Sequence, residues 1–191
     1  YVNTSAAVKA EQTRLGSRAR FEGRTWNREI TDDLRRFLAV IDTFFFATAS
    51  ADGRPYIQHR GGPPGFLKPI GTHTLAFADF AGNQQYISLG HLRENDRAHI
   101  FVLHFATQQR LKLWGRARIV EGDIELMERL VDPTYRARPQ RAIAFTIEAW
   151  DINCRQHILP RYTEADIAPA VDQLARRIKE LEDEVARLKG Q

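Results

Sequence analysis

Alternating apolar and polar positions predict a series of short strands through the middle of the chain. The predicted strands cover residues 44–50, 55–60, 73–78, 98–105, 110–120 and 142–150. Between the first two, Asp52-Gly53 favours the positive φ angles of a tight hairpin turn. A four-residue polar link, 106–109, joins the fourth and fifth strands. Six mostly antiparallel strands joined by hairpins predict a small β-barrel.

Short helices are predicted around these strands. Thr31, followed by two aspartates, begins a helix whose apolar residues Leu34, Phe37, Leu38 and Ile41 share one face. Ser88 is predicted to cap a second short helix that ends near Asn95. Asp123 opens a third, and the Ala-rich charged segment 5–20 is compatible with a fourth. The fold class predicted is therefore mainly β with flanking helices.

The C-terminal segment carries the most regular pattern in the sequence. Its apolar residues repeat at spacings of four and three over three heptads, and they are Ile167, Val171, Leu174, Ile178, Leu181, Val185 and Leu188. This is the seam of a coiled coil. Three heptads are marginal alone, so the helix pairs with its copy in a dimer or folds back on its own barrel. The narrow seam and charged flanks favour the dimer.

The chain is therefore divided into three parts. We expect an N-terminal arm and helix over residues 1–30, a barrel domain over 31–162, and a coiled-coil helix over 163–191.

Composition narrows the class of protein. With 43% hydrophobic and 27% charged residues, the 191-residue chain has the composition of a soluble globular protein. The net charge is +4, but the basic residues are spread along the chain, which argues against a nucleic-acid groove. A single cysteine, Cys154, and the lack of a long apolar run or signal segment favour a reducing, cytoplasmic location without a membrane span.

A polar strand face next to a glycine-rich loop is the first candidate for chemistry. Alternation places Tyr56, Gln58 and Arg60 on one face of their strand, with Ile57 and His59 on the other. The loop 61–65 follows directly, and its glycines allow backbone to approach a ligand. The alternative is that the loop is only a turn and Arg60 a surface cation.

A phosphate site is predicted from residues on separate elements. Arg110 and Lys112 share one face of an otherwise apolar strand, so they need solvent or an anion. Ser88 adds a hydroxyl at a helix start, where unpaired backbone N–H groups suit phosphate. Together with Arg60, these residues indicate that the stretch 60–112 wraps a phosphorylated planar cofactor.

Other reaction centres are disfavoured by the sequence. The six histidines show no metal-ligand spacing, and no Cys/His cluster is present, so no metal site is predicted. The sequence contains no GxSxG, P-loop or GxGxxG motif, which argues against hydrolases, kinases and NAD-binding folds.

Several segments taken together resemble one known family. They are FATASADGRP at 46–55, QHRGGPPGF at 58–66, DFAGNQQYIS at 79–88, the pair Leu92 and Asn95 at Leu-x-x-Asn spacing, and LWGRA at 113–117. As a set, these are similar to the pyridoxamine 5'-phosphate oxidase-related FMN-binding proteins, over about residues 25 to 162.

The resemblance implies a six-stranded FMN-binding split β-barrel and a homodimer with FMN at the subunit interface. It also implies a small-molecule substrate or electron donor and flavin redox chemistry. The expected cofactor-binding residues are Gln58, His59, Arg60, Gly61, Asp79, Asn83, Gln84, Ser88, Arg110, Lys112, Trp150 and Gln156. No side chain is obliged to act as acid or base, so no catalytic residue is named.

The sequence also departs from the vitamin-B6 oxidase. Ile87-Ser88 stands where the oxidase has an Arg-Lys pair, and the C-terminal substrate-binding pattern is not found. We therefore expect an FMN-dependent oxidoreductase acting on a different small molecule. The alternative is a non-catalytic module that binds flavin or haem for sensing, with the coiled coil carrying the signal. A basic coiled-coil protein that binds nucleic acid is the least favoured alternative.

Overall fold

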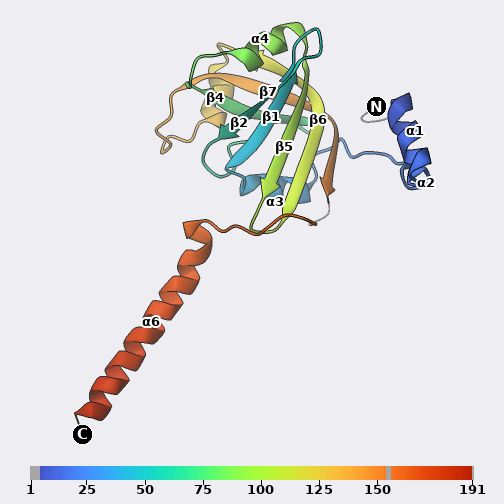
Figure 1. Cartoon of the computed structure of the whole chain (residues 1–191). Coiled ribbons are helices and arrows are strands. Elements are labelled where there is room, and N and C mark those ends of the chain that lie inside the picture. The colour runs from blue at the N-terminus through green and yellow to red at the C-terminus, as the bar shows by residue number, and fades with distance from the viewer. Residues whose placement is uncertain (1–4, 154–155, 191) are drawn as a thin grey trace. The chain divides into compact units, whose positions relative to one another are not determined.

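The computed structural model describes residues 5–153 and 156–190. It contains two compact units (Figure 1): Tyr1–Leu103 with Gln109–Cys154, and His104–Gln108 with Arg155–Gln191. The first unit holds the sheet and the second holds the long C-terminal helix.

Antiparallel strands form one sheet in the first unit. Their bounds are β1 Thr43–Ala49, β2 Pro55–Gly61, β3 Lys68–Pro69, β4 Thr74–Phe80, β5 Arg97–His104, β6 Gln109–Val120 and β7 Pro139–Asn153. The order across the sheet is β2-β1-β5-β6-β7-β4-β3. All six predicted strands are confirmed. The described residues form a seventh strand, β3, whose two residues are too few to show a period in the sequence.

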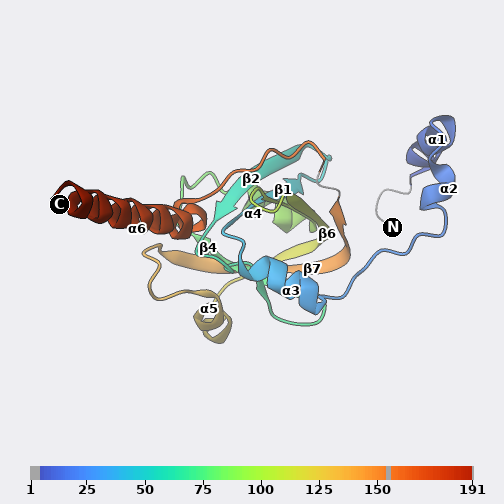
Figure 2. The ribbon, with the colours of Figure 1, turned by 90° about the horizontal axis from the view of Figure 1, so that it is seen from below.

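The sheet curls but does not close. β2 lies at one edge and β3 at the other, so β2 and β4 are not joined by a backbone ladder. Figure 2 looks along the curled sheet and shows β2 and β4 as neighbours across its open side. This arrangement confirms the mainly β, split-barrel fold predicted from the sequence.

Alternation along the strands fills the interior with aromatic and branched side chains. The largest fully buried ones are Phe44, Phe46, Phe77, Phe145, Leu34, Leu38, Leu67, Leu75, Ile100, Leu111, Leu113 and Ile143. Phe44 packs against Phe66 and Phe77, with ring centroids 5.2 and 5.1 Å apart. The core therefore joins β1 to β4 across the open side of the sheet.

Two helices lie at opposite ends of the curled sheet (Figures 1 and 2): α3 (Asp32–Ala39) and α4 (Ile87–Glu94). Thr31 caps α3 as predicted, because its hydroxyl accepts from the Leu34 N–H. The cap predicted for α4 is wrong. Tyr86 occupies the N-cap without a side-chain hydrogen bond, and Ser88 lies inside the first turn.

The third short helix, α5 (Ile124–Leu130), begins after Asp123 as predicted. Its side chains Leu126 and Leu130 form a second, smaller cluster with alanines of β4 and β7.

The N-terminal arm contains α1 (Ala6–Arg14) and α2 (Arg18–Phe21). The extended segment after α2 is anchored on the sheet. Asn27 bridges to Trp150, and the rings of Trp26 and Trp114 meet edge to face at 5.7 Å.

The second unit contains α6 (Glu164–Lys189), which confirms the predicted C-terminal helix. Thr163 and Asp166 form a capping box at its start. Every residue of α6 is exposed, including the seven apolar residues of the heptad pattern. Across the part of the chain that the structure describes, no helix is both long and apolar enough to cross a membrane.

Candidate functional site

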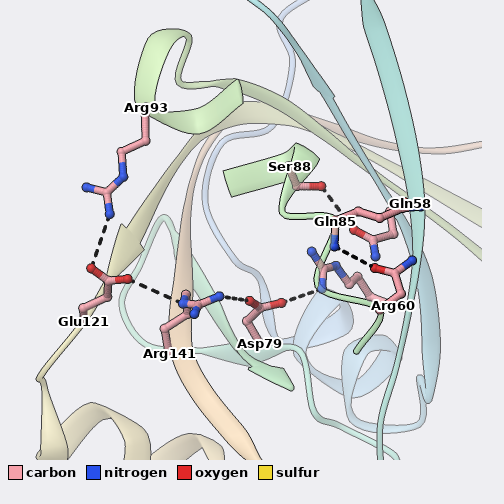
Figure 3. Close-up of polar contacts among 9 residues, drawn as sticks. Gln58, Arg60, Asp79, Gln85, Ser88, Arg93, Glu121 and Arg141 are labelled. Atoms are coloured by element: carbon pink, nitrogen blue, oxygen red, sulfur yellow. Dashed lines mark hydrogen bonds and ion pairs between the residues drawn. The ribbon is translucent and has the colours of Figure 1, made fainter. Parts of the chain in front are cut away.

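Three charged residues join the two sides of the open sheet. Arg60 on β2 pairs with Asp79 on β4, and Asp79 also accepts from Nη1 of Arg141 on β7 at 3.0 Å. We call Arg60, Asp79 and Arg141 the arginine clasp (Figure 3). Only 14% of each arginine side chain and 7% of the aspartate side chain are exposed.

The strand register explains why the clasp faces the interior. Arg60 is the partner of Phe44, and Arg141 is the partner of Asp79. Residues directly opposite each other in antiparallel strands share a face. Arg60 therefore points to the same side as the buried Phe44, near the ring of Phe77, 5.9 Å from its centroid.

Positive charge exceeds negative charge in the clasp. Two guanidinium groups meet one carboxylate, and the Nε atoms of Arg60 and Arg141 are buried without a hydrogen-bond partner. A buried donor without an acceptor costs about 1–3 kcal/mol, and more when it is charged. The clasp is therefore suited to accept one further anionic group.

A second acid lies farther out. Glu121 is 3.5 Å from Arg141 Nε and 3.3 Å from Nη2 of Arg93 on α4. The Glu121 side chain is 57% exposed, so water screens most of its effect on the clasp.

The start of α4 lies beside the clasp (Figure 3). Ser88 is buried, and its hydroxyl donates to Oε1 of Gln58 on β2 at 3.3 Å. Because the N-cap residue Tyr86 supplies no side-chain acceptor, the first-turn N–H groups carry the positive end of the helix dipole without a cap. The predicted residues Gln58, Arg60, Asp79 and Ser88 are thus brought together.

The loop before α4 has an unusual backbone. Gln84 and Tyr86 adopt left-handed φ angles of 59° and 54°, which side chains other than glycine adopt rarely. Asn83 stabilises the loop by accepting from the Gln85 N–H at 3.2 Å. The predicted site residues Asn83 and Gln84 are therefore exposed loop residues next to the clasp end of the sheet.

The glycine-rich loop after β2 is held by the protein itself. The N–H of Gly62 donates to Asp42 and that of Gly65 to Ile41. These two donors are occupied by backbone carbonyls, so the alternative that this loop is mainly a turn fits the structure better. Gly61 ends β2 opposite Thr43.

The other predicted cations lie on the outer face of the sheet. Arg110 and Lys112 alternate with the buried Leu111 and Leu113, so they point away from the core. His59 also points outward, with its Nε2 2.5 Å from the Thr43 hydroxyl. In the β6–β7 register Lys112 lies opposite Asp151. Asp151 is ten residues along β7 from Arg141, which is roughly 30 Å in an extended strand.

Trp150 and Gln156 are the last two predicted cofactor-binding residues. Trp150 is buried near the far end of β7, where its indole N–H donates to the Glu29 carbonyl at 2.8 Å. Gln156 lies in an exposed turn of the second unit. Within a single chain, Arg110 and Lys112 face away from the clasp, and we call these two residues the outer set.

Arg141 was not predicted from the sequence. The sixth strand was predicted to begin at Ala142, whereas β7 begins at Pro139. With the longer strand, Arg141 shares the inward face of Ile143 and Phe145, and an inward arginine at a strand end would have been a usable signal. Among the residues described, no group of three or more His, Cys, Asp or Glu could hold a metal ion.

Trp114 lies between Lys112 and His99 among the contacts of the outer face. Trp114 contacts His99 at 5.1 Å between ring centroids, and Nζ of Lys112 lies 5.5 Å from the Trp114 ring. Burial, and secondly the Lys112 charge, lower the pKa of His99 from 6.5 to about 4. His99 is therefore neutral at physiological pH.

The low pKa of His99 predicts acid sensitivity. Between pH 6.5 and about 4 the unfolded chain binds a proton at His99 that the folded chain does not. The free energy of unfolding should therefore fall by roughly 2–3 kcal/mol as the pH is lowered through this window. Chemical unfolding at a series of pH values measures the loss, and His99→Gln should remove it. Lys112→Ala should raise the pKa of His99 only partly, because burial is the larger cause of its low value. A His99 pKa of 6.5 in the parent chain, measured by NMR titration, would contradict this account.

The model of the family described as Pyridoxamine 5'-phosphate oxidase matches residues 30–154, which include the clasp and the outer face. No curated protein sequence matches the chain.

Similar solved structures include two of HupZ from Group A Streptococcus. One has 15% identity and a TM-score of 0.52, covering 65% of this chain and 99% of that one. The other has 16% identity and a TM-score of 0.51, covering 70% and 99%. A candidate pyridoxamine 5'-phosphate oxidase from Lactobacillus delbrueckii has 14% identity and a TM-score of 0.50, covering 65% and 95%. At these identities the likeness shows a shared fold.

Proposed function

Because the chain belongs to the pyridoxamine 5'-phosphate oxidase family, whose model matches residues 30–154, we propose that it binds FMN and acts as an FMN-dependent oxidoreductase on a small molecule. The observation that carries the proposal is the arginine clasp. It holds two guanidinium groups against one buried carboxylate, and the buried Nε of Arg60 has no hydrogen-bond acceptor, next to the uncapped start of α4.

The residues fit the phosphate of FMN. A phosphate supplies several acceptor oxygens and about two negative charges, which match the unpaired Nε of Arg60 and the excess positive charge of the clasp. Arg60, Arg141 and Ser88 would hold it together with the first-turn amides of α4. Gln58 would contact the cofactor from the neighbouring position on β2. Bound FMN would supply electron transfer, while the protein orients and tunes it.

The outer set would contribute to a cofactor site only through a second copy of the chain. Arg110 and Lys112 face away from the clasp of their own chain, and they lie on β6 opposite the far end of β7. In a homodimer with FMN at the subunit interface, the outer set of one copy contributes to the site that contains the clasp of the other. This arrangement would use all the predicted cations, and it would leave Asp79 as the partner of the clasp arginines.

The substrate is proposed to differ from pyridoxamine phosphate, because Ile87-Ser88 replaces the Arg-Lys pair of the oxidase. Absorbance of the purified protein and titration with FMN test binding directly. A colourless protein with no thermal shift on adding FMN would contradict the proposal. Steady-state turnover with NADPH and a panel of acceptors tests catalysis; bound flavin without turnover would favour the non-catalytic binding module.

Variants test which residues bind the phosphate. Arg60→Gln should weaken FMN binding about 10- to 100-fold, since a hydrogen bond to a charged group contributes about 1.5–3 kcal/mol. Lys112→Ala should also weaken binding, whereas Arg118→Gln, at an exposed position on β6, should leave it unchanged. Fluorescence quenching of FMN gives the dissociation constants. Equal affinity in all three variants would show that other residues hold the phosphate.

A mixing experiment tests the shared site. Arg60→Gln and Lys112→Ala chains are refolded together, so that mixed dimers form. Each mixed dimer should contain one intact site, with Arg60 from one copy and Lys112 from the other. The controls are the two variants refolded separately, because every site in those dimers lacks either Arg60 or Lys112. No recovery of FMN binding in the mixture above both controls would exclude a site shared between copies.

A further inference from the structure

The exposed apolar stripe of α6 has a regular heptad assignment. Spacing of three follows position a and spacing of four follows position d, which fixes the letters. Position a holds Val171, Ile178 and Val185, and position d holds Leu174, Leu181 and Leu188 after Ile167. Pro169 falls at position f, away from the seam. The stripe is exposed along its whole length, with Leu174 64% and Leu188 61% accessible.

The residue types at a and d indicate both the number and the direction of strands. β-branched residues at a with leucine at d favour a two-stranded coiled coil whose helices run parallel. All three a residues of the seam are β-branched, and the d residues from 174 onward are leucine. From this pattern we propose that α6 forms a parallel two-stranded coiled coil with α6 of a second copy of this chain.

Charges beside the seam support the same direction. In a parallel pair, position g of one helix lies near position e of the next heptad on the other helix. This places Arg177 against Glu182 and Glu184 against Lys189 of a second copy. Each contact occurs twice by symmetry, so four attractive pairs flank the seam and no like charges meet.

In an antiparallel pair of α6 helices, the charges beside the seam are less complementary than in a parallel pair. There the flanking contacts run from g to g and from e to e, and aligning the seam residues sets Arg177 against Glu184. Only this pair is formed, twice by symmetry, while Glu182 and Lys189 face alanines. The charges therefore favour the parallel arrangement.

The helix surface already has the shape that such a partner needs. A hollow on α6 is lined by Ile178, Leu181, Glu182 and Val185, followed by Ala186 and Lys189. The first four occupy positions a, d, e and the next a, which form the hole that receives a d side chain in a parallel pair. Leu181 of a second copy has the position and size to fill it.

Disulfide trapping in the full-length chain tests whether the two α6 helices run parallel. The one native cysteine is removed by Cys154→Ser, and Leu188→Cys is added. In a parallel pair position 188 faces itself, so mild oxidation should link most chains. Asp183→Cys, at the outward position f, is the matched control and should link at least about tenfold less at equal time.

The alternatives give different results. An antiparallel pair places position 188 opposite 171, so only a mixture of Leu188→Cys and Val171→Cys chains would link efficiently. If α6 binds another protein or folds back on its own chain, Leu188→Cys would link no faster than Asp183→Cys. Either result would overturn the proposal, and neither depends on whether FMN binds.

Charge reversal provides a second test. In the Cys154→Ser, Leu188→Cys chain, Arg177→Glu replaces two attractive pairs with two repulsive ones. The rate of disulfide trapping should then fall about tenfold at low salt. Adding Glu182→Arg to the same chain should restore trapping, because the reversed pair is again attractive in the parallel arrangement. Rescue by Glu184→Arg instead of Glu182→Arg would indicate an antiparallel pair.

Discussion

Replacing Asp79 with alanine is expected to lower the free energy of unfolding by about 3–5 kcal/mol, because it leaves two buried guanidinium groups without their shared carboxylate. Asp79 is 5% exposed and contacts both Arg60 and Arg141. Chemical denaturation followed by fluorescence or circular dichroism measures the change.

A matched control comes from the same sheet. Glu148 on β7 pairs with Arg116 at 2.8 Å, but both side chains are more than 40% exposed. Glu148→Ala should therefore lower the free energy of unfolding by only a small fraction of the loss expected for Asp79→Ala, since exposed ion pairs contribute little. Equal losses in the two variants would mean that the clasp carboxylate is no more important to stability than a surface charge.

Gly115→Ala is expected to prevent stable folding, with a loss of more than about 4 kcal/mol. Gly115 lies at a register shift between β6 and β7. A Cβ placed there would be 2.0 Å from the Thr146 carbonyl oxygen and 2.9 Å from Cζ of Phe145. The nearest contact is backbone held in a β ladder, so it cannot move aside as a flexible side chain would.

Gly90→Ala is the contrasting substitution. Gly90 is exposed on α4, and a Cβ there would have nothing within 4 Å. Alanine should therefore stabilise the helix by about 0.5–1 kcal/mol relative to glycine. Thermal unfolding of both variants gives the comparison. A Gly115→Ala protein that unfolds at the parent temperature would show that the β6–β7 bulge can relax more than its geometry suggests.

Local patterns predicted most of the fold. Alternation located the long strands, and the 3–4 spacing located α3 and α6, because both signals depend only on neighbouring residues. The two-residue strand β3 has no such signal. The start of α4 was misplaced because a serine near a helix start resembles a cap, whereas Ser88 contacts Gln58 across the site.

The candidate site was predicted less completely. The sequence placed Arg60 with Gln58 on one strand face, and Arg110 with Lys112 on another. It could not show that these faces point in opposite directions, because that depends on which strands pair and in what register. Arg141 was missed because its strand was predicted to begin one residue after it. Its contact with Asp79 joins residues 62 positions apart, so no local pattern shows that contact.

The open side of the sheet, where side chains rather than a backbone ladder join β2 to β4, couples ligand occupancy to folding. A ligand held by the clasp would contact both sides of the opening, and the unfolded chain would offer no such site. By mass action it would stabilise the folded state by about 2.7 kcal/mol at a free concentration one hundred times its dissociation constant. The resistance of this protein to unfolding is thereby expected to depend on the supply of cofactor.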